Sequence, residues 1–181
     1  MPSFLAETPW VAASTIALAA GYTDWRTRRI PNWLTVPGLL AGIALNALAA
    51  GWPGTKDSLL GAGLGLALLL PFVVIRVLGA GDWKLVGALG ACLGLQHLPM
   101  VLLVSVLVNG AMAIAMIIQK KRMLQTMRNF AHMLAAVFTL HLPGPELTLD
   151  NPEAVKVPFG VAVAVAVILY TARHAWGMTS S

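Results

Sequence analysis

The chain has 181 residues, of which 58% are hydrophobic and only 10% are charged, and its formal net charge is +5. A mean hydropathy of +0.79 and long apolar runs indicate one integral membrane domain over residues 1–181, with no room for a large soluble domain as well. The sequence pI of about 9.9 does not call for a nucleic-acid partner, because basic residues at the membrane boundary account for most of it.

Six apolar runs predict an all-α, polytopic membrane protein with about six transmembrane helices. These runs are residues 8–22, 33–50, 59–78, 85–95, 99–118 and 155–171. The first run is expected to be a retained helix rather than a cleaved signal peptide, because residues 1–10 contain Glu7 and no Lys or Arg. The fourth run is short for a full crossing, unless its helix continues through Asp82 and Lys84 in a wet, protein-lined cavity.

Glycines within two of these runs indicate helices that pack closely. Gly61, Gly63 and Gly65 lie in the third run, and the fourth run has a similar set. Small residues let membrane helices approach one another closely, so we expect these two helices to make tight contacts. The fourth-run set is Gly87, Gly90 and Gly94.

The basic residues indicate how the chain crosses the membrane. Six spans place ten of the twelve Lys and Arg residues on one side and leave only Lys56 and Arg173 on the other. The side with more Lys and Arg is the cytoplasmic side. Both termini then face outward, and Asp24 and Asp82 both lie near the cytoplasmic face.

A segment between the fifth and sixth runs has the pattern of an amphipathic helix. Met123, Met127, Phe130, Leu134 and Val137 recur at spacings of three and four residues. This pattern predicts a helix on the cytoplasmic membrane surface. It is either a passive interfacial helix or a gate that guides a substrate.

Two carboxylates are the main candidates for chemistry. Asp24 and Asp82 each lie beside the end of an apolar run, where a carboxylate is costly unless it is neutral, paired or near water. Two carboxylates brought together are the minimum equipment for aspartic acid/base catalysis. The scattered histidines form no HExxH pair, and the single cysteine, Cys92, excludes a four-cysteine zinc site, so we expect neither a metal nor a cofactor.

Three segments resemble those of the type IV prepilin peptidases. Residues 79–85 read Gly-Ala-Gly-Asp-Trp-Lys-Leu, which is similar to the GxGDxKL segment of that family. Residues 24–32, from Asp to Arg-Ile-Pro-Asn, resemble its first-aspartate segment, and residues 156–160 resemble the Pro-Phe-Gly segment that opens its last helix. Presenilin-like and signal-peptide-peptidase-like proteases also carry GxGD, but the combination with Arg-Ile-Pro-Asn is more specific.

The resemblance implies an aspartic endopeptidase of the bacterial inner membrane that removes the basic leader of prepilins or pseudopilins at the cytoplasmic face. Asp24 and Asp82 would be its catalytic pair. The chain looks most like the short peptidases of tight-adherence (Flp) pilus systems, because it lacks the cysteine-rich segment of bifunctional relatives, and no methyltransferase activity is expected. The residues expected to bind substrate or shape the site are Gly79, Gly81, Lys84, Arg29, Pro31, Asn32, Pro158, Phe159 and Gly160.

Other interpretations of these residues stay open. Gly79 and Gly81 could simply end a helix, and Lys84 could mark the membrane boundary rather than tune Asp82. Pro158 could simply start a helix. The whole chain could instead be a proton-coupled transporter in which Asp24 and Asp82 relay protons, or a non-catalytic scaffold for pilus assembly.

Overall fold

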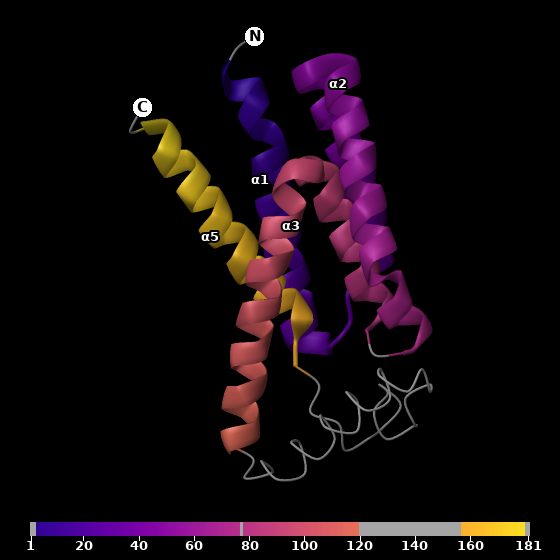
Figure 1. Cartoon of the computed structure of the whole chain (residues 1–181), viewed down its shortest axis with the longest axis vertical. Coiled ribbons are helices and arrows are strands. Elements are labelled where there is room, and N and C mark those ends of the chain that lie inside the picture. Colours follow the sequence, from indigo (N-terminus) through magenta and orange to yellow (C-terminus); the bar gives the residue numbers. More distant parts are fainter. Residues whose placement is uncertain (1–2, 77, 120–156, 180–181) are drawn as a thin grey trace.

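The computed structural model describes residues 3–76, 78–119 and 157–179, and these ranges consist of helices with short connections (Figure 1). No strand occurs in these three ranges, which confirms the all-α prediction for them. The predicted surface helix that contains Met127 and Phe130 lies outside the described residues. The helices are α1 (Ser3–Thr27), α2 (Asn32–Val74), α3 (Ala80–Gln119) and α5 (Phe159–Thr179).

Two of the helices fold back on themselves at glycines. The backbone leaves the helical region at Gly51, with a φ of 62°, and at Gly94, with a φ of 74°. Positive φ values are readily adopted by glycine because it has no Cβ. Each helix therefore has two limbs, residues 32–50 and 52–74 of α2 and residues 80–93 and 95–119 of α3 (Figure 1).

The described helices include apolar stretches of membrane-spanning length. Asn32–Val74 and Ala80–Met116 are long and apolar enough to cross a membrane, and Phe159–His174 is a shorter apolar helix. Large apolar side chains also point outward, and Leu40 and Leu107 are 61% and 65% exposed. Extensive exposed apolar surface of this kind is a sign of contact with lipid or with another protein.

The first limb of α3 is the centre of the molecule. Every residue from position 85 to position 94 is buried. α2 approaches this limb backbone to backbone, since a Cβ on Gly61 would meet the Gly90 carbonyl and a Cβ on Gly42 would lie 2.8 Å from the Cys92 nitrogen. The predicted tight glycine contacts are thus present, but Gly63 takes no part, because nothing lies within 4 Å of its Cβ position.

Polar side chains of α2 satisfy the backbone groups that the bend at Gly94 leaves without helical partners. Asn46 Nδ2 donates to the carbonyls of Ala91, at 2.8 Å, and Cys92, at 3.1 Å. Ser58 Oγ also donates to the Ala91 carbonyl, at 2.6 Å. On the other side of the bend, the Leu95 N–H donates to Asp57 Oδ1 at 3.0 Å. These bonds stabilise the turn of α3 because helix ends otherwise expose unpaired donors and acceptors.

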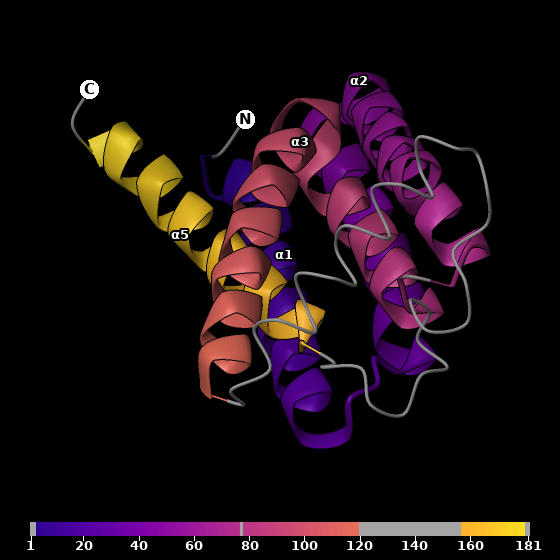
Figure 2. The ribbon, with the colours of Figure 1, turned by 60° about the horizontal axis from the view of Figure 1, so that its bottom comes forward.

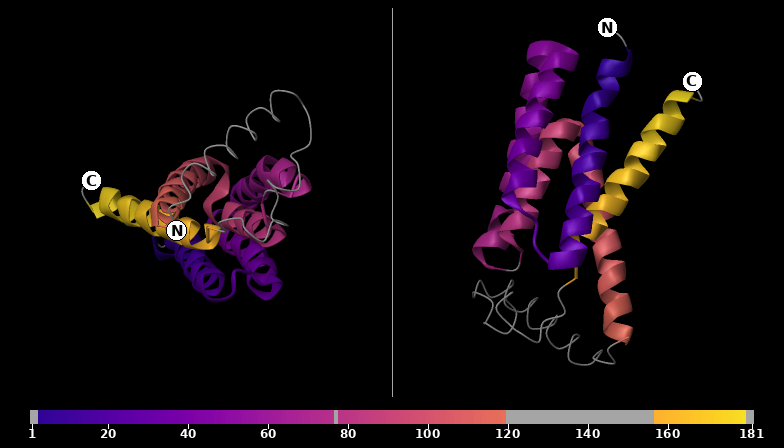
Figure 3. Two further views of the ribbon diagram at one scale, coloured as in Figure 1. Left: turned by 90° about the horizontal axis from the view of Figure 1, so that it is seen from below. Right: turned by 180° about the vertical axis from the view of Figure 1, so that it is seen from behind.

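α1 packs against α2, where a Cβ on Gly38 would lie 2.9 Å from Ile16 Cδ1, and α5 packs against α1 and α3 (Figures 2 and 3). α1 and α5 touch closely near the start of α5, where a Cβ on Gly21 would lie 2.9 Å from the Ala164 Cβ. They diverge toward the end of the molecule that carries both termini (Figure 3, right). α1 ends, α3 begins and α5 begins at the opposite end, which is the lower end in Figure 1.

Candidate active site

Asp24 lies in the last turn of α1, and its side chain is only 6% exposed. The helix ends just after it, where the Arg28 N–H donates to the Asp24 carbonyl at 2.8 Å and Arg28 adopts a φ of 54°. A left-handed residue at this position is a common way to end a helix, although glycine usually occupies it. The turn brings Arg28 and Arg29 back beside the Asp24 carboxylate.

The start of α5 holds the Asp24 carboxylate. The Gly160 N–H donates to Asp24 Oδ2 at 2.8 Å. N–H groups in the first turn of a helix have no partner within the helix, and a negative charge is favourable there, so Asp24 caps α5. A Cβ on Gly160 would lie 2.9 Å from the Asp24 Cβ and 3.2 Å from the Ala20 carbonyl, so a larger residue does not fit.

Asp82 is held at the start of α3 in a similar way. It is the third residue of the helix, and the Gly79 N–H donates to its carboxylate. The Gly79 carbonyl accepts the first helical hydrogen bond, from the Trp83 N–H at 3.2 Å. This reciprocal arrangement is a capping box, in which the side chain of the third helical residue bonds back to the residue before the helix.

The segments that contain Asp24 and Asp82, residues 24–32 and 79–85, are in direct contact. A Cβ on Gly81 would lie 3.0 Å from the Ile30 carbonyl and 3.2 Å from the Ile30 Cβ. Pro31 precedes α2 and its carbonyl accepts from the Leu34 N–H, at 3.1 Å. Asn32 Oδ1 then accepts a hydrogen bond from Lys84 Nζ at 3.0 Å. The packing of Gly81 on Ile30 and the hydrogen bond from Lys84 to Asn32 therefore both join the two segments.

The carboxylates of Asp24 and Asp82 line one cavity of about 300 Å³. The two groups are close enough to interact electrostatically, and Arg28 also interacts with Asp24. At about 30 Å³ for each water molecule, the cavity has room for several waters or a short stretch of peptide. Its other lining residues are Arg28, Arg29, Ile30, Gly79, Ala80 and Gly81.

The structure distributes the predicted site residues over three places. Arg29, Gly79 and Gly81 line the cavity beside the carboxylates. Lys84, Asn32 and Pro31 form the junction next to it. Gly160 contacts Asp24 directly, whereas Pro158 is buried. Phe159 packs against two clusters of buried apolar side chains, one that includes Leu89 and one that includes Val86.

Three cavity-lining residues were not among the predicted site residues: Arg28 and the apolar pair Ile30 and Ala80. Ile30 is buried, at 8% exposed, and receives Gly81. Ile30 lies in the Asp24 segment, residues 24–32, and Ala80 lies in the Asp82 segment, residues 79–85. Their positions between functional residues were the signal that could have identified them as site residues. Neither has polar side-chain chemistry, and the sequence therefore gave no reason to select them.

Comparison with known proteins places these motifs in a family. The model of the type IV leader peptidase family matches residues 11–114, a range that includes both Asp24 and Asp82. No solved structure matches the chain.

Several curated relatives carry the name prepilin leader peptidase/N-methyltransferase. The protein of Aeromonas hydrophila is 37% identical over 110 residues, which cover 57% of this chain and 38% of that protein. The Neisseria gonorrhoeae protein is 33% identical, with 62% and 43% covered, and that of Escherichia coli K12 is 35% identical, with 60% and 51% covered. The chain thus spans about half or less of the length of these relatives. Since the family model covers more than half of the chain, the chain belongs to the type IV leader peptidase family.

Proposed function

We propose that this chain is an aspartic endopeptidase that removes the leader peptide of type IV prepilins or pseudopilins. The observation that carries the proposal is that Asp24 and Asp82, 58 positions apart in the sequence, line one small cavity. Each carboxylate is held by a backbone N–H at the start of a helix. The family membership and the names of the relatives support the same activity.

The proposed reaction uses the two carboxylates as one unit. Two neighbouring carboxylates cannot both ionise cheaply, so they share a proton. The ionised carboxylate takes a proton from a water, whose oxygen attacks the scissile carbonyl carbon, while the protonated carboxyl donates to the carbonyl oxygen. Collapse of this intermediate breaks the C–N bond, and a proton passes to the leaving amine.

Backbone contacts support this chemistry by fixing both carboxylates. The Gly160 and Gly79 N–H groups bind carboxylate oxygens without adding a side chain to the cavity. Backbone donors on helix ends move little, so they hold the reacting oxygens in a preorganised geometry. Arg28 and Arg29 add positive charge at the same cavity.

We also propose that α1, the four limbs of α2 and α3, and α5 make six membrane crossings. The limb of residues 52–74 is roughly 35 Å long at 1.5 Å per residue, which matches a bilayer core of about 30 Å. The first limb of α3 begins at Ala80, so Asp82 and Lys84 belong to the helix, and this lengthens the short fourth span.

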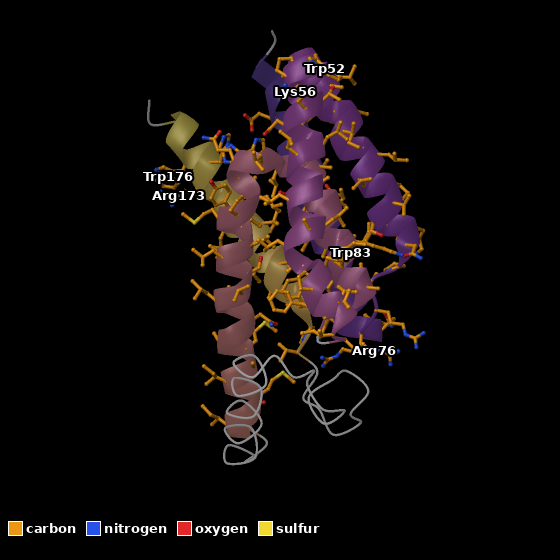
Figure 4. The ribbon with its side chains drawn as sticks, turned by 45° about the vertical axis from the view of Figure 1, so that its right-hand side comes forward. Trp52, Lys56, Arg76, Trp83, Arg173 and Trp176 are labelled. Carbon is orange, nitrogen blue, oxygen red and sulfur yellow. The ribbon has the colours of Figure 1, made fainter. Side chains whose placement is uncertain are left out.

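The basic residues of the described ranges support a cytoplasmic active site. Lys56 and Arg173 lie toward the end that carries the termini, together with Trp52 and Trp176, whereas Arg76 lies at the opposite end (Figure 4). Arg28 and Arg29 line the cavity at that opposite end. Membrane proteins keep their excess of Lys and Arg on the cytoplasmic side, and Trp is enriched at both interfaces.

The experiment that tests this proposal incubates the purified protein with a prepilin and a methyl donor and analyses the product by mass spectrometry. We expect a product shortened by its leader, with an unmethylated amino terminus. The reason is that the chain resembles the short peptidases without the cysteine-rich segment of bifunctional relatives, and its single cysteine, Cys92, is buried. Proton flux into vesicles that contain the protein, without cleavage, would instead support a transporter. A methylated product would overturn the proposed lack of methyltransferase activity.

A further inference from the structure

Arg28 has an uncommon backbone conformation beside the carboxylate cavity. It directly follows α1, and its φ of 54° lies in the left-handed region that favours glycine. Residues held in such conformations gather at functional sites, where the surrounding structure fixes them. The conformation alone assigns no role, because Arg76 has a φ of 57° and does not line the cavity. What distinguishes Arg28 is the group that its side chain faces.

The left-handed turn brings Arg28 back to the residue four positions earlier. The Arg28 N–H donates to the Asp24 carbonyl at 2.8 Å, and the guanidinium interacts electrostatically with the Asp24 carboxylate. Arg28 also lines the cavity that holds both carboxylates. An opposite charge beside a carboxylate favours its ionised form. The side chain of Arg28 therefore stabilises the charged form of Asp24.

The backbone contacts of the two carboxylates are alike. The Gly160 N–H donates to Asp24 at the start of α5, and the Gly79 N–H donates to Asp82 at the start of α3. Each carboxylate also gains from the partial positive charge of a helix N-terminus. These matched contacts do not distinguish one acid from the other, so a difference between them has to come from a charged side chain.

The elements packed around the pair contribute few charged side chains. Residues 30–55 of α2 and residues 157–168 of α5 contain none. On α3, Lys84 follows Asp82 by two positions, and residues two apart do not share a helix face. The Lys84 Nζ donates instead to Asn32 Oδ1, at 3.0 Å. The charged side chains that can make the two acids unequal are therefore those that follow Asp24 in the sequence.

The other two arginines at the end of α1 are placed differently from Arg28. Arg26 lies over the Tyr22 ring, with its Cζ 5.9 Å from the ring centroid. Arg29 lines the cavity beside Arg28 and adds positive charge to it. Its effect on the carboxylates has to be separated from that of Arg28 by experiment.

We propose that Arg28 divides the roles of the pair, so that Asp24 is the ionised general base and Asp82 is the protonated general acid. The proposal rests on the proposed peptidase function. Because Arg28 acts through Asp24, it is a positioning residue.

This division returns both carboxyls to their starting states after each turnover. Asp24 takes a proton from water as the water oxygen bonds to the scissile carbonyl carbon, and Asp82 donates its proton to the carbonyl oxygen. The intermediate then collapses: a hydroxyl returns its proton to Asp82, the C–N bond breaks, and Asp24 passes its proton to the leaving amine. Asp24 is again ionised and Asp82 again protonated.

Infrared titration of single carboxyls tests the effect of Arg28 without cleavage. The carboxyl band of Asp82→Asn reports Asp24, that of Asp24→Asn reports Asp82, and subtraction of the double variant removes the other carboxyls. Arg28→Asn is added to each, because asparagine tolerates the left-handed conformation. We expect the pH at which Asp24 is half protonated to rise by about one unit, as expected for loss of a neighbouring arginine, and that of Asp82 to change much less.

Three further variants make the titration specific. Arg76→Asn is the same substitution at another left-handed position, outside the cavity lining, and should shift neither carboxyl. Arg28→Lys keeps the charge and should restore the titration of Asp24. Equal shifts of Asp24 and Asp82 in Arg28→Asn would overturn the proposal, and so would a shift of Asp24 in Arg29→Asn or Arg76→Asn as large as that in Arg28→Asn.

The pH dependence of prepilin cleavage is the second readout. With both aspartates present, the kcat/KM profile of Arg28→Asn should move to higher pH by about one unit, because Asp24 then ionises at higher pH. Arg28→Lys should restore the profile. A merely structural role would lower the rate or the Tm without moving the profile, and would contradict the proposal. A wild-type protein that cleaves no prepilin would reject the peptidase function itself, whatever the infrared shifts.

Discussion

Glycine backbone groups hold both carboxylates of the proposed catalytic pair. Gly160 and Gly79 each donate an N–H to one of them, and Gly81 packs on Ile30 between the two acidic segments. At these positions the glycine gives the backbone access that a side chain would block. The two halves of the site are therefore sensitive to a single added methyl group.

Gly160→Ala tests this sensitivity. The new Cβ would lie 2.9 Å from the Asp24 Cβ and would displace the carboxylate from its N–H donor. We expect kcat/KM for prepilin cleavage to fall about 100-fold, which is the order of loss that a small misplacement of reacting groups causes. The matched control is Gly63→Ala, because nothing lies within 4 Å of that Cβ position. Equal activity of the two variants would show that Gly160 does not position Asp24.

The sequence was informative about which residues form the site and less informative about their contacts. Asp24 and Asp82 were predicted to lie near the same face because the basic residues fix the direction of each span, and the structure brings them to one cavity. Gly160 was expected to shape the site, but its bond to Asp24 joins residues 136 positions apart, and no local pattern encodes such a contact. The hydrogen bond between Lys84 and Asn32 was missed for the same reason.

Among the helices, the positions of the ends and bends determine where the site residues lie. The bends of α2 and α3 lie at Gly51 and Gly94, shortly before Pro53 and Pro99. The exact bend residues depend on positive φ values and on polar partners from α2, which periodicity does not show. Asn46 and Asp57 were not singled out, although a polar residue inside an apolar run, as at Asn46, is a signal that could have been used.

Asn46→Leu should destabilise the bend of α3. The substitution leaves the Cys92 carbonyl without its side-chain donor, and an unsatisfied buried acceptor costs about 1–3 kcal/mol. We expect a lower Tm in detergent and a parallel loss of cleavage at elevated temperature. Thr15→Ala, which removes an exposed hydrogen bond within α1, serves as the control and should leave the Tm nearly unchanged. A Tm of Asn46→Leu equal to that of the control would refute this account of the bend.

The whole molecule has two ends with different roles. The carboxylate cavity lies at the end where α1 stops and α5 starts, and the two bends lie at the other end (Figure 1). The predicted division of basic residues places Lys56 and Arg173 on the side away from the active site. Both residues lie toward the end of the molecule that carries the two bends, whereas Arg76 lies at the opposite end (Figure 4). The proposed orientation in the membrane follows from this distribution.

Single cysteines test the orientation. In a Cys92→Ala background, Arg76→Cys and Lys56→Cys each place one exposed thiol, at opposite ends of the molecule. A membrane-impermeant thiol reagent added to intact cells should label position 56 only, and it should label position 76 only after the cells are opened. The reverse pattern would place the cavity on the outer side and contradict a cytoplasmic active site.

The central claim is that Asp24 and Asp82 act together to cleave a peptide bond. The most direct measurement is the rate of prepilin cleavage by purified Asp24→Asn, Asp82→Asn and the double variant, with membrane insertion verified. Asn keeps the shape of Asp but cannot exchange the proton, so each single variant should lose nearly all activity. The double variant should be little worse, because groups that act as a unit have non-additive losses.

Asp57→Asn is the matched control for this measurement. Asp57 accepts a hydrogen bond from the Leu95 N–H at the bend end, and an Asn oxygen can accept the same bond. We predict cleavage close to the wild-type rate for this variant and almost none for Asp24→Asn or Asp82→Asn. Substantial cleavage by either of those two variants would contradict the assignment of the catalytic pair.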